Sequence, residues 1–238
     1  KDKYNNANQA FIYYDKEFHQ TKQSVEMSEQ NNSLSSEKIV CGPTFKLIRK
    51  SNILIKKKQV CFFNSAFSDG YAANTIESHF NFLKFIDKFL KRNDFKVIFK
   101  SKDKIEACEN YNSSFKNLID SMKKNKNLNI IDYDLDLNEI IYPSQISIHM
   151  PFASTGVISL SLKKKFFFYD SLNFFRNSYF SKFDKLKLIS TSETENYEFL
   201  EFYSKIDQTK YEEYIDDCFL ETFGEHYDNS DNIIKKYL

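Results

Sequence analysis

The sequence predicts an α/β protein built on a parallel sheet with helices on both faces. Short apolar segments of about four to six residues alternate with amphipathic segments of about ten to twenty, which is typical of βαβ units. Hydrophobic residues make up 41% of the 238 residues, enough for a sizeable core. The 34 basic and 33 acidic residues leave a formal net charge of +1, so we expect no overall attraction to nucleic acid or to anionic membranes.

The first 56 residues are predicted to stand apart from the main domain, which we assign to residues 57–238. Residues 1–36 are polar, and the run 28–33 has the composition of a loop or linker. A short strand is expected at 38–41, followed by a basic segment at 46–58. No run has the roughly 18 apolar residues of a membrane-spanning helix, and the first residues lack the apolar core of a signal peptide. We therefore expect a cytoplasmic protein.

The main domain is expected to begin with a buried apolar strand at 59–64. Asn74 is a good N-cap for the next helix, in which apolar residues recur at helical spacing from Ile76 to Leu90. The remaining expected elements are strands at 96–99, 128–131, 146–149, 166–169 and 187–189, and helices at 105–122, 137–141, after Gly156, at 194–206 and at 211–223. This order indicates a Rossmann-like domain, preceded by a short partial N-terminal segment.

Candidate site residues follow three of the predicted strands. Ligands of an open parallel sheet bind beyond the carboxyl ends of its strands, so the loops at those ends hold the best candidates. The three loops contain Ser68, Asp69 and Gly70; Lys100, Ser101 and Lys102; and His149, Ser154, Thr155 and Gly156.

The turn Ser154-Thr155-Gly156 is the strongest of these signals. Between a strand and a helix, such a turn gathers backbone N–H groups, hydroxyls and the positive helix end, which suits a phosphate. The same turn can serve only as an N-cap. The chain has only four glycines, so a backbone requirement is expected at Gly156: either a positive φ or the close approach of a ligand. The alternative is that Gly156 belongs to an ordinary tight turn.

The other candidates have complementary roles. Lys100 and Lys102 can supply point charges to a diphosphate, with Ser101 as a further donor, although lysines also form solvated surfaces. His149 can bond a ribose, a base or a phosphate, or act as a structural donor. Asp69 is the most plausible acid or base, in a flexible loop with Ser68 and Gly70.

Several classes of protein lack their motif in this sequence. GxGxxG after a strand, GxxxxGK[ST], HExxH and GxSxG are all absent, which argues against dinucleotide oxidoreductases, P-loop NTPases, zincins and α/β-hydrolases. No His, Cys and carboxylate cluster suggests a tightly held metal. Cys41, Cys61, Cys108 and Cys218 are widely spaced and are expected to be buried, reduced thiols.

The order of these motifs resembles the C-terminal half of bacterial GT-B glycosyltransferases that build capsule, lipopolysaccharide or other surface polysaccharides. The likeness covers residues 38–238 and rests on QVCFFNSAFSDG, KVIFKSK and ISIHMPFASTGVISLSLKKKFFFYD. It implies that Ser154, Thr155 and Gly156 receive the donor phosphate, with Lys100 and Lys102 nearby. The implied partners are a CMP-, UDP-, CDP- or GDP-linked sugar and a glycan or glycolipid acceptor, with no further cofactor, in the cytoplasm or at the inner face of the membrane.

Two departures from that pattern matter. Only 56 residues precede the main domain, as a possible remnant of an acceptor domain, so the catalytic base that the N-terminal half often supplies can be missing here. The helix after Gly156 lacks the Glu of many retaining members, which favours an inverting enzyme. A serine/threonine turn with lysines but no acidic metal-binding pair favours metal-independent transfer. Two alternatives stay open: a non-catalytic module that binds a phosphorylated ligand or docks a partner, and a polyol-phosphate transferase on the same frame.

Overall fold

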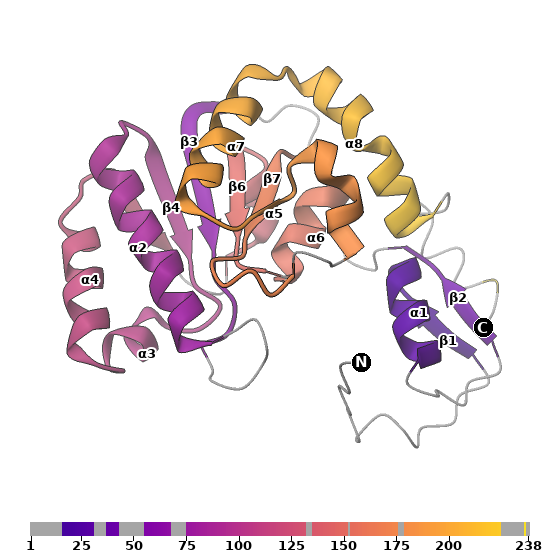
Figure 1. The fold of residues 1–238 in the computed structure, drawn as a ribbon, viewed down its shortest axis with the longest axis horizontal. Coiled ribbons are helices and arrows are strands. Elements are labelled where there is room, and N and C mark those ends of the chain that lie inside the picture. The colour runs from indigo at the N-terminus through magenta and orange to yellow at the C-terminus, as the bar shows by residue number, and fades with distance from the viewer. Residues whose placement is uncertain are drawn as a thin grey trace. The chain divides into compact units, whose positions relative to one another are not determined.

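The computed structural model describes residues 16–30, 37–42, 55–67, 75–131, 135–151, 153–175, 179–224 and 236 (Figure 1). The chain divides into two compact units, one of Ile48–Tyr214 and one of Lys1–Leu47 with Ile215–Leu238. These units do not coincide with the predicted segments 1–56 and 57–238, and that domain division stays a prediction.

The larger unit contains a six-stranded sheet in which every neighbouring pair is parallel. Its strands are β3 (Lys56–Phe63), β4 (Lys96–Lys100), β5 (Leu128–Ile131), β6 (Ser144–His149), β7 (Phe166–Tyr169) and β8 (Ile189–Ser190). The strand order is β5-β4-β3-β6-β7-β8. Counted along the chain, these strands follow the Rossmann order, in which the sheet grows first to one side of β3 and then to the other. The predicted fold class is confirmed.

Helices flank this sheet (Figure 1). They are α2 (Ile76–Arg92), α3 (Ile105–Glu109), α4 (Ser113–Lys123), α5 (Leu137–Ile141), α6 (Ser154–Ser161), the 3-10 segment Tyr179–Leu186, α7 (Glu193–Lys205) and α8 (Gln208–Phe223), whose residues from Ile215 onward group with the other unit. Each of the expected helices of the main domain is found, with differences at the boundaries.

Three boundaries differ from the sequence prediction for local reasons. The N-cap of α2 is Thr75, whose side chain accepts a hydrogen bond from the Ser78 N–H, and not Asn74. The helix expected at 105–122 is two helices, because Asn112 caps a new one by accepting from the Phe115 N–H at 3.0 Å. The last strand begins at Ile189 rather than at 187, and Lys187 has a φ of 50°, far from the values of a regular strand.

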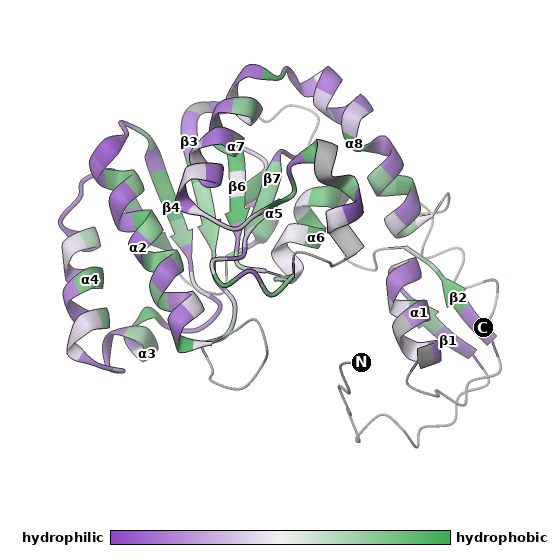
Figure 2. Ribbon diagram, viewed as in Figure 1, coloured by the Kyte–Doolittle hydropathy of each residue, from purple (hydrophilic) through white to green (hydrophobic). Residues whose placement is uncertain are grey.

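Aromatic side chains fill the core on both faces of the sheet. All four residues of β7 are buried, and in β3 the ring of Phe62 lies 5.6–6.1 Å from the rings of Phe82, Phe85 and Phe89 on α2. Figure 2 shows the central strands as predominantly hydrophobic, with hydrophilic residues on the outer surfaces of the helices. Burial of both faces explains why these strands read as continuous apolar runs instead of alternating ones.

The smaller unit holds a parallel strand pair, β1 (Lys16–His19) and β2 (Glu37–Val40), joined through α1 (Lys22–Gln30). The hydroxyl of Thr21 caps α1 by accepting from the Ser24 N–H at 3.1 Å. The strand predicted at 38–41 is therefore present as β2. Residues 28–30, predicted as linker, are helical, and 31–33 lie outside the described residues. Among the described helices, none combines the length and apolar character needed to cross a membrane.

Candidate functional site

A cavity of about 370 Å³ lies where the strand order reverses, beyond the carboxyl ends of β3 and β4 and beside the start of α6. We call it the switch-point pocket, since this is where open α/β sheets bind their ligands. Its lining residues are Phe63, Asn64, Ser65, Lys100, Ser101, Lys102, Leu137, Ala153, Ser154 and Thr155. The structure thus brings together two of the three loops singled out in the sequence.

Asn64 holds the floor of this pocket in place. Its Nδ2 donates to the Ser101 Oγ at 2.9 Å, and its Oδ1 accepts from the Lys102 N–H at 2.8 Å. Asn64 and Ser101 are both buried, so these bonds are shielded from water and join the turn after β4 to the end of β3. Sequence analysis missed Asn64, although an amide directly after a buried strand was a usable signal.

The two lysines differ in exposure. Lys100 is only 7% exposed, whereas Lys102 is open to solvent, and both line the pocket. No carboxylate stands among the pocket's described lining residues. Two lysine side chains at one cavity suit an anionic ligand.

The first turn of α6 supplies part of the pocket's lining. Its N-cap is Ala153, whose side chain has no acceptor and makes no capping hydrogen bond. Ser154, exposed, and Thr155, half-buried, follow as the first helical residues rather than as the N-cap that the sequence left as an alternative. The positive end of the helix therefore lies at the pocket, and its N-cap residue contributes no side-chain cap.

His149 lies directly behind Thr155. The imidazole is fully buried, with Nδ1 2.8 Å from the Thr155 Oγ1 and Nε2 2.9 Å from the Ser147 Oγ and 3.1 Å from the Ser159 Oγ. It also stacks on the Phe63 ring at 4.9 Å between centroids. Burial lowers the pKa of His149 to about 3, so the ring is neutral at physiological pH. The sequence left open a ligand role and a structural role for His149; these contacts are structural, and the ligand role stays a prediction.

Gly156 has a structural role that the sequence did not predict. A Cβ at this position would lie 2.3 Å from Cε1 and Cζ of Phe168 on β7, and the Gly156 N–H donates to the Ala153 carbonyl at 2.9 Å. The glycine is thus required by the close packing of α6 on the sheet. Its φ is not positive, and an aromatic ring makes a close approach to it.

The third predicted loop is described only at its start. Ser68, Asp69 and Gly70 lie outside the described residues. The preceding residues are held on two sides, since the Phe67 N–H donates to Asp103 Oδ2 at 2.7 Å and the His79 Nε2 lies 3.1 Å from the Ala66 carbonyl. Burial lowers the pKa of His79 to about 4, so this ring is a neutral donor.

The described residues contain no cluster of metal-binding side chains.

All four cysteines are buried and free, as the sequence predicted.

Comparison with known families gives the chain its biological setting. A family model described as "Polysaccharide biosynthesis PFTS motif protein" matches residues 55–197, which is more than half of the chain and includes every residue of the switch-point pocket. The chain belongs to this family and so to polysaccharide biosynthesis. No curated protein matches the chain.

The family's description contains the letters PFTS. Taken as one-letter residue codes, they agree at three of four positions with Pro151-Phe152-Ala153-Ser154, which contains the one Pro-Phe pair in the sequence. Alanine stands here in place of threonine, at the position that is the N-cap of α6.

Proposed function

We propose that this chain carries the nucleotide-sugar-binding domain of a GT-B-type glycosyltransferase that assembles a surface polysaccharide. The observation that carries the proposal is the switch-point pocket, in which Lys100, Lys102 and the first turn of α6 line one cavity within the region that the family model matches. Membership of a polysaccharide biosynthesis family supports a sugar donor over other phosphorylated ligands.

The chemistry of sugar transfer requires what this pocket offers. When the bond between the sugar and its phosphate breaks, negative charge develops on the leaving phosphate. Two ammonium groups and a helix N-terminus stabilise that charge, and the hydroxyls of Ser154 and Thr155 can donate to the phosphate oxygens. Because lysines supply the positive charge, we propose a metal-independent transfer. Because the helix after Gly156 contains no Glu, we propose a direct displacement with inversion. The donor would be a CMP-, UDP-, CDP- or GDP-linked sugar, and the acceptor a glycan or glycolipid.

The base that deprotonates the acceptor hydroxyl is a separate matter. The described lining of the switch-point pocket contains no carboxylate and no histidine. Asp69, four residues beyond the lining residue Ser65, remains the proposed base. The same observation favours one alternative, a non-catalytic domain that binds a phosphorylated ligand without turning it over.

Thermal unfolding with added nucleotides tests the proposal. CMP, CDP, UDP and GDP are added separately, and the matching nucleotide at about 100 times its Kd should stabilise the chain by about 2.7 kcal/mol, or roughly 5–10 °C. Lys102→Met should weaken binding about tenfold. The matched control is Lys96→Met, an exposed lysine at the opposite end of the same strand. A folded chain that responds to none of the four nucleotides would exclude a donor domain.

Turnover of the donor distinguishes a transferase from a non-catalytic binding module. A transferase with a bound donor should at least hydrolyse it slowly, releasing free nucleotide and sugar, whereas the binding module would hold the donor intact.

A further inference from the structure

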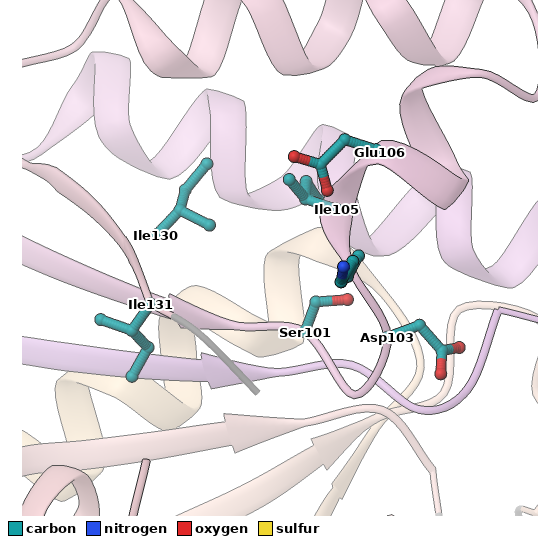
Figure 3. A pocket seen from close by; sticks show the side chains of 7 residues that line it. Ser101, Asp103, Ile105, Glu106, Ile130 and Ile131 are labelled. Carbon is teal, nitrogen blue, oxygen red and sulfur yellow. The ribbon is translucent and has the colours of Figure 1, made fainter. Parts of the chain in front are cut away.

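A second cavity, of about 270 Å³, opens beyond the carboxyl ends of β4 and β5 (Figure 3). We call it the β4–β5 pocket. It is lined by Ser101, Asp103, Lys104, Ile105, Glu106, Ile130 and Ile131. Nothing in the proposed phosphate chemistry uses it. Its volume is below the roughly 300–1,000 Å³ of sites that hold a whole drug-sized ligand, so it suits one part of a larger molecule.

The two cavities adjoin at one residue. Ser101 lines both of them, and it is held there by the bond from Asn64. A ligand whose phosphate lies against Lys100 and Lys102 can therefore continue past Ser101, over the end of β4, into the β4–β5 pocket. In sheets with this strand order, an extended nucleotide runs along the carboxyl edge in this direction.

The lining of the β4–β5 pocket differs in character from that of the switch-point pocket. Figure 3 shows Ile105 and Glu106 at the start of α3 across from Ile130, while Ile131 points to the other face of the sheet, as the next residue of a strand does. The carboxylates of Asp103 and Glu106 outnumber the single ammonium group of Lys104, and they accept hydrogen bonds from hydroxyl or amino groups. Aliphatic side chains on two sides of the pocket, with acceptors beside them, fit a flat base attached to a ring that carries a vicinal diol.

The two carboxylates are not equivalent. Asp103 Oδ2 already accepts from the Phe67 N–H at 2.7 Å, where it holds the loop after β3. Glu106 is exposed on the first turn of α3. Glu106 is therefore the carboxylate that can turn toward a ligand without releasing a structural bond.

We propose that the β4–β5 pocket binds the nucleoside of the donor, with the base between Ile105 and Ile130 and the ribose hydroxyls donating to Glu106. The proposal rests on the proposed function, because it assumes that the phosphates occupy the switch-point pocket. The proposal assigns the ribose to a carboxylate that follows β4, the second strand of the sheet along the chain. The helix after Gly156 contains no carboxylate that could take this role.

Calorimetric titration tests this with the whole chain. The probes are inorganic pyrophosphate, the nucleotide that gives the largest thermal shift, and the 2′-deoxy form of that nucleotide. The wild-type chain should bind the ribonucleotide about tenfold more tightly than its deoxy form, as expected for a hydrogen bond to a charged group. In Glu106→Gln this preference should fall to below about twofold, with pyrophosphate binding unchanged or tighter. Glu198→Gln, an exposed glutamate on α7, is the matched control.

The outcomes distinguish the two proposals. If Glu106→Gln keeps the full preference for the ribonucleotide, the nucleoside assignment is wrong while the phosphate site stands. If the loss is equal for pyrophosphate and nucleotide, Glu106 acts on the fold or the overall charge, and the assignment is again wrong. If the wild-type chain binds neither pyrophosphate nor any nucleotide, the proposed function itself fails.

Discussion

Mild acid is expected to destabilise this fold through two buried histidines. His149 and His79 are 0% and 1% exposed, and burial lowers their pKa values from 6.5 to about 3 and about 4. In the folded chain both rings therefore stay neutral at pH 5. In the unfolded chain both take up a proton as the pH falls below about 6.5.

The sign and size of the effect follow from this difference in proton uptake. Because the unfolded state binds more protons, the free energy of unfolding falls as the pH drops from about 6.5 toward the folded pKa values. At pH 5 each histidine costs about 2 kcal/mol, and the pair about 4 kcal/mol. Domains of this kind are stable by only about 5–15 kcal/mol, so the loss should be large.

Urea unfolding followed by circular dichroism between pH 7.5 and pH 5 measures this loss. The His79→Gln variant keeps a side-chain N–H for the Ala66 carbonyl but cannot be protonated, so below pH 6 its stability should fall less steeply by about 1.4 kcal/mol per pH unit. The ring signals of His79 and His149 in NMR spectra should not titrate between pH 8 and pH 5. An unchanged slope in His79→Gln, or a His149 ring that titrates near pH 6.5, would refute the reasoning.

Two further predictions concern the packing of the core. Gly156→Ala should lower the free energy of unfolding by about 1–3 kcal/mol in spite of alanine's better helix propensity, because the new methyl group would overlap the Phe168 ring. Adding Phe168→Leu should recover part of this loss. An unchanged free energy of unfolding in Gly156→Ala would show that the Phe168 ring moves to make room for the methyl group. An aromatic disulfide reagent should label none of the four buried cysteines in the folded chain and all four in urea. Burial keeps the reagent out and also raises the pKa values of Cys61 and Cys108 to about 12. Rapid labelling of the native chain would contradict the burial of these thiols.

The sequence predicted the order of elements well because that information is local. Each buried strand is a short apolar run and each helix an apolar stripe at helical spacing, so both can be read from neighbouring residues. The errors at Asn74, 105–122 and 187–189 arise where side-chain caps and a single positive φ decide the boundary. Such details depend on one hydrogen bond or one backbone angle, which periodicity does not record.

The candidate site was predicted in part. The placement of Lys100, Lys102, Ser154 and Thr155 around one cavity follows from the rule that carboxyl ends of parallel strands share an edge. The ligand roles of these residues stay predictions. Asn64 was missed because its partners, Ser101 and Lys102, are 37 and 38 residues away along the chain.

By itself, then, the sequence determined the α/β class, the succession of strands and helices, and the loops in which a phosphate site can form. Only the tertiary structure decided where the described residues of those loops lie and what they contact. His149 is buried behind Thr155, and Gly156 makes room for Phe168 from the next strand, so neither faces the pocket as the sequence suggested. The physical reason is that burial and close packing depend on which elements meet across the sheet, and the strand order that sets those meetings is a property of the folded chain.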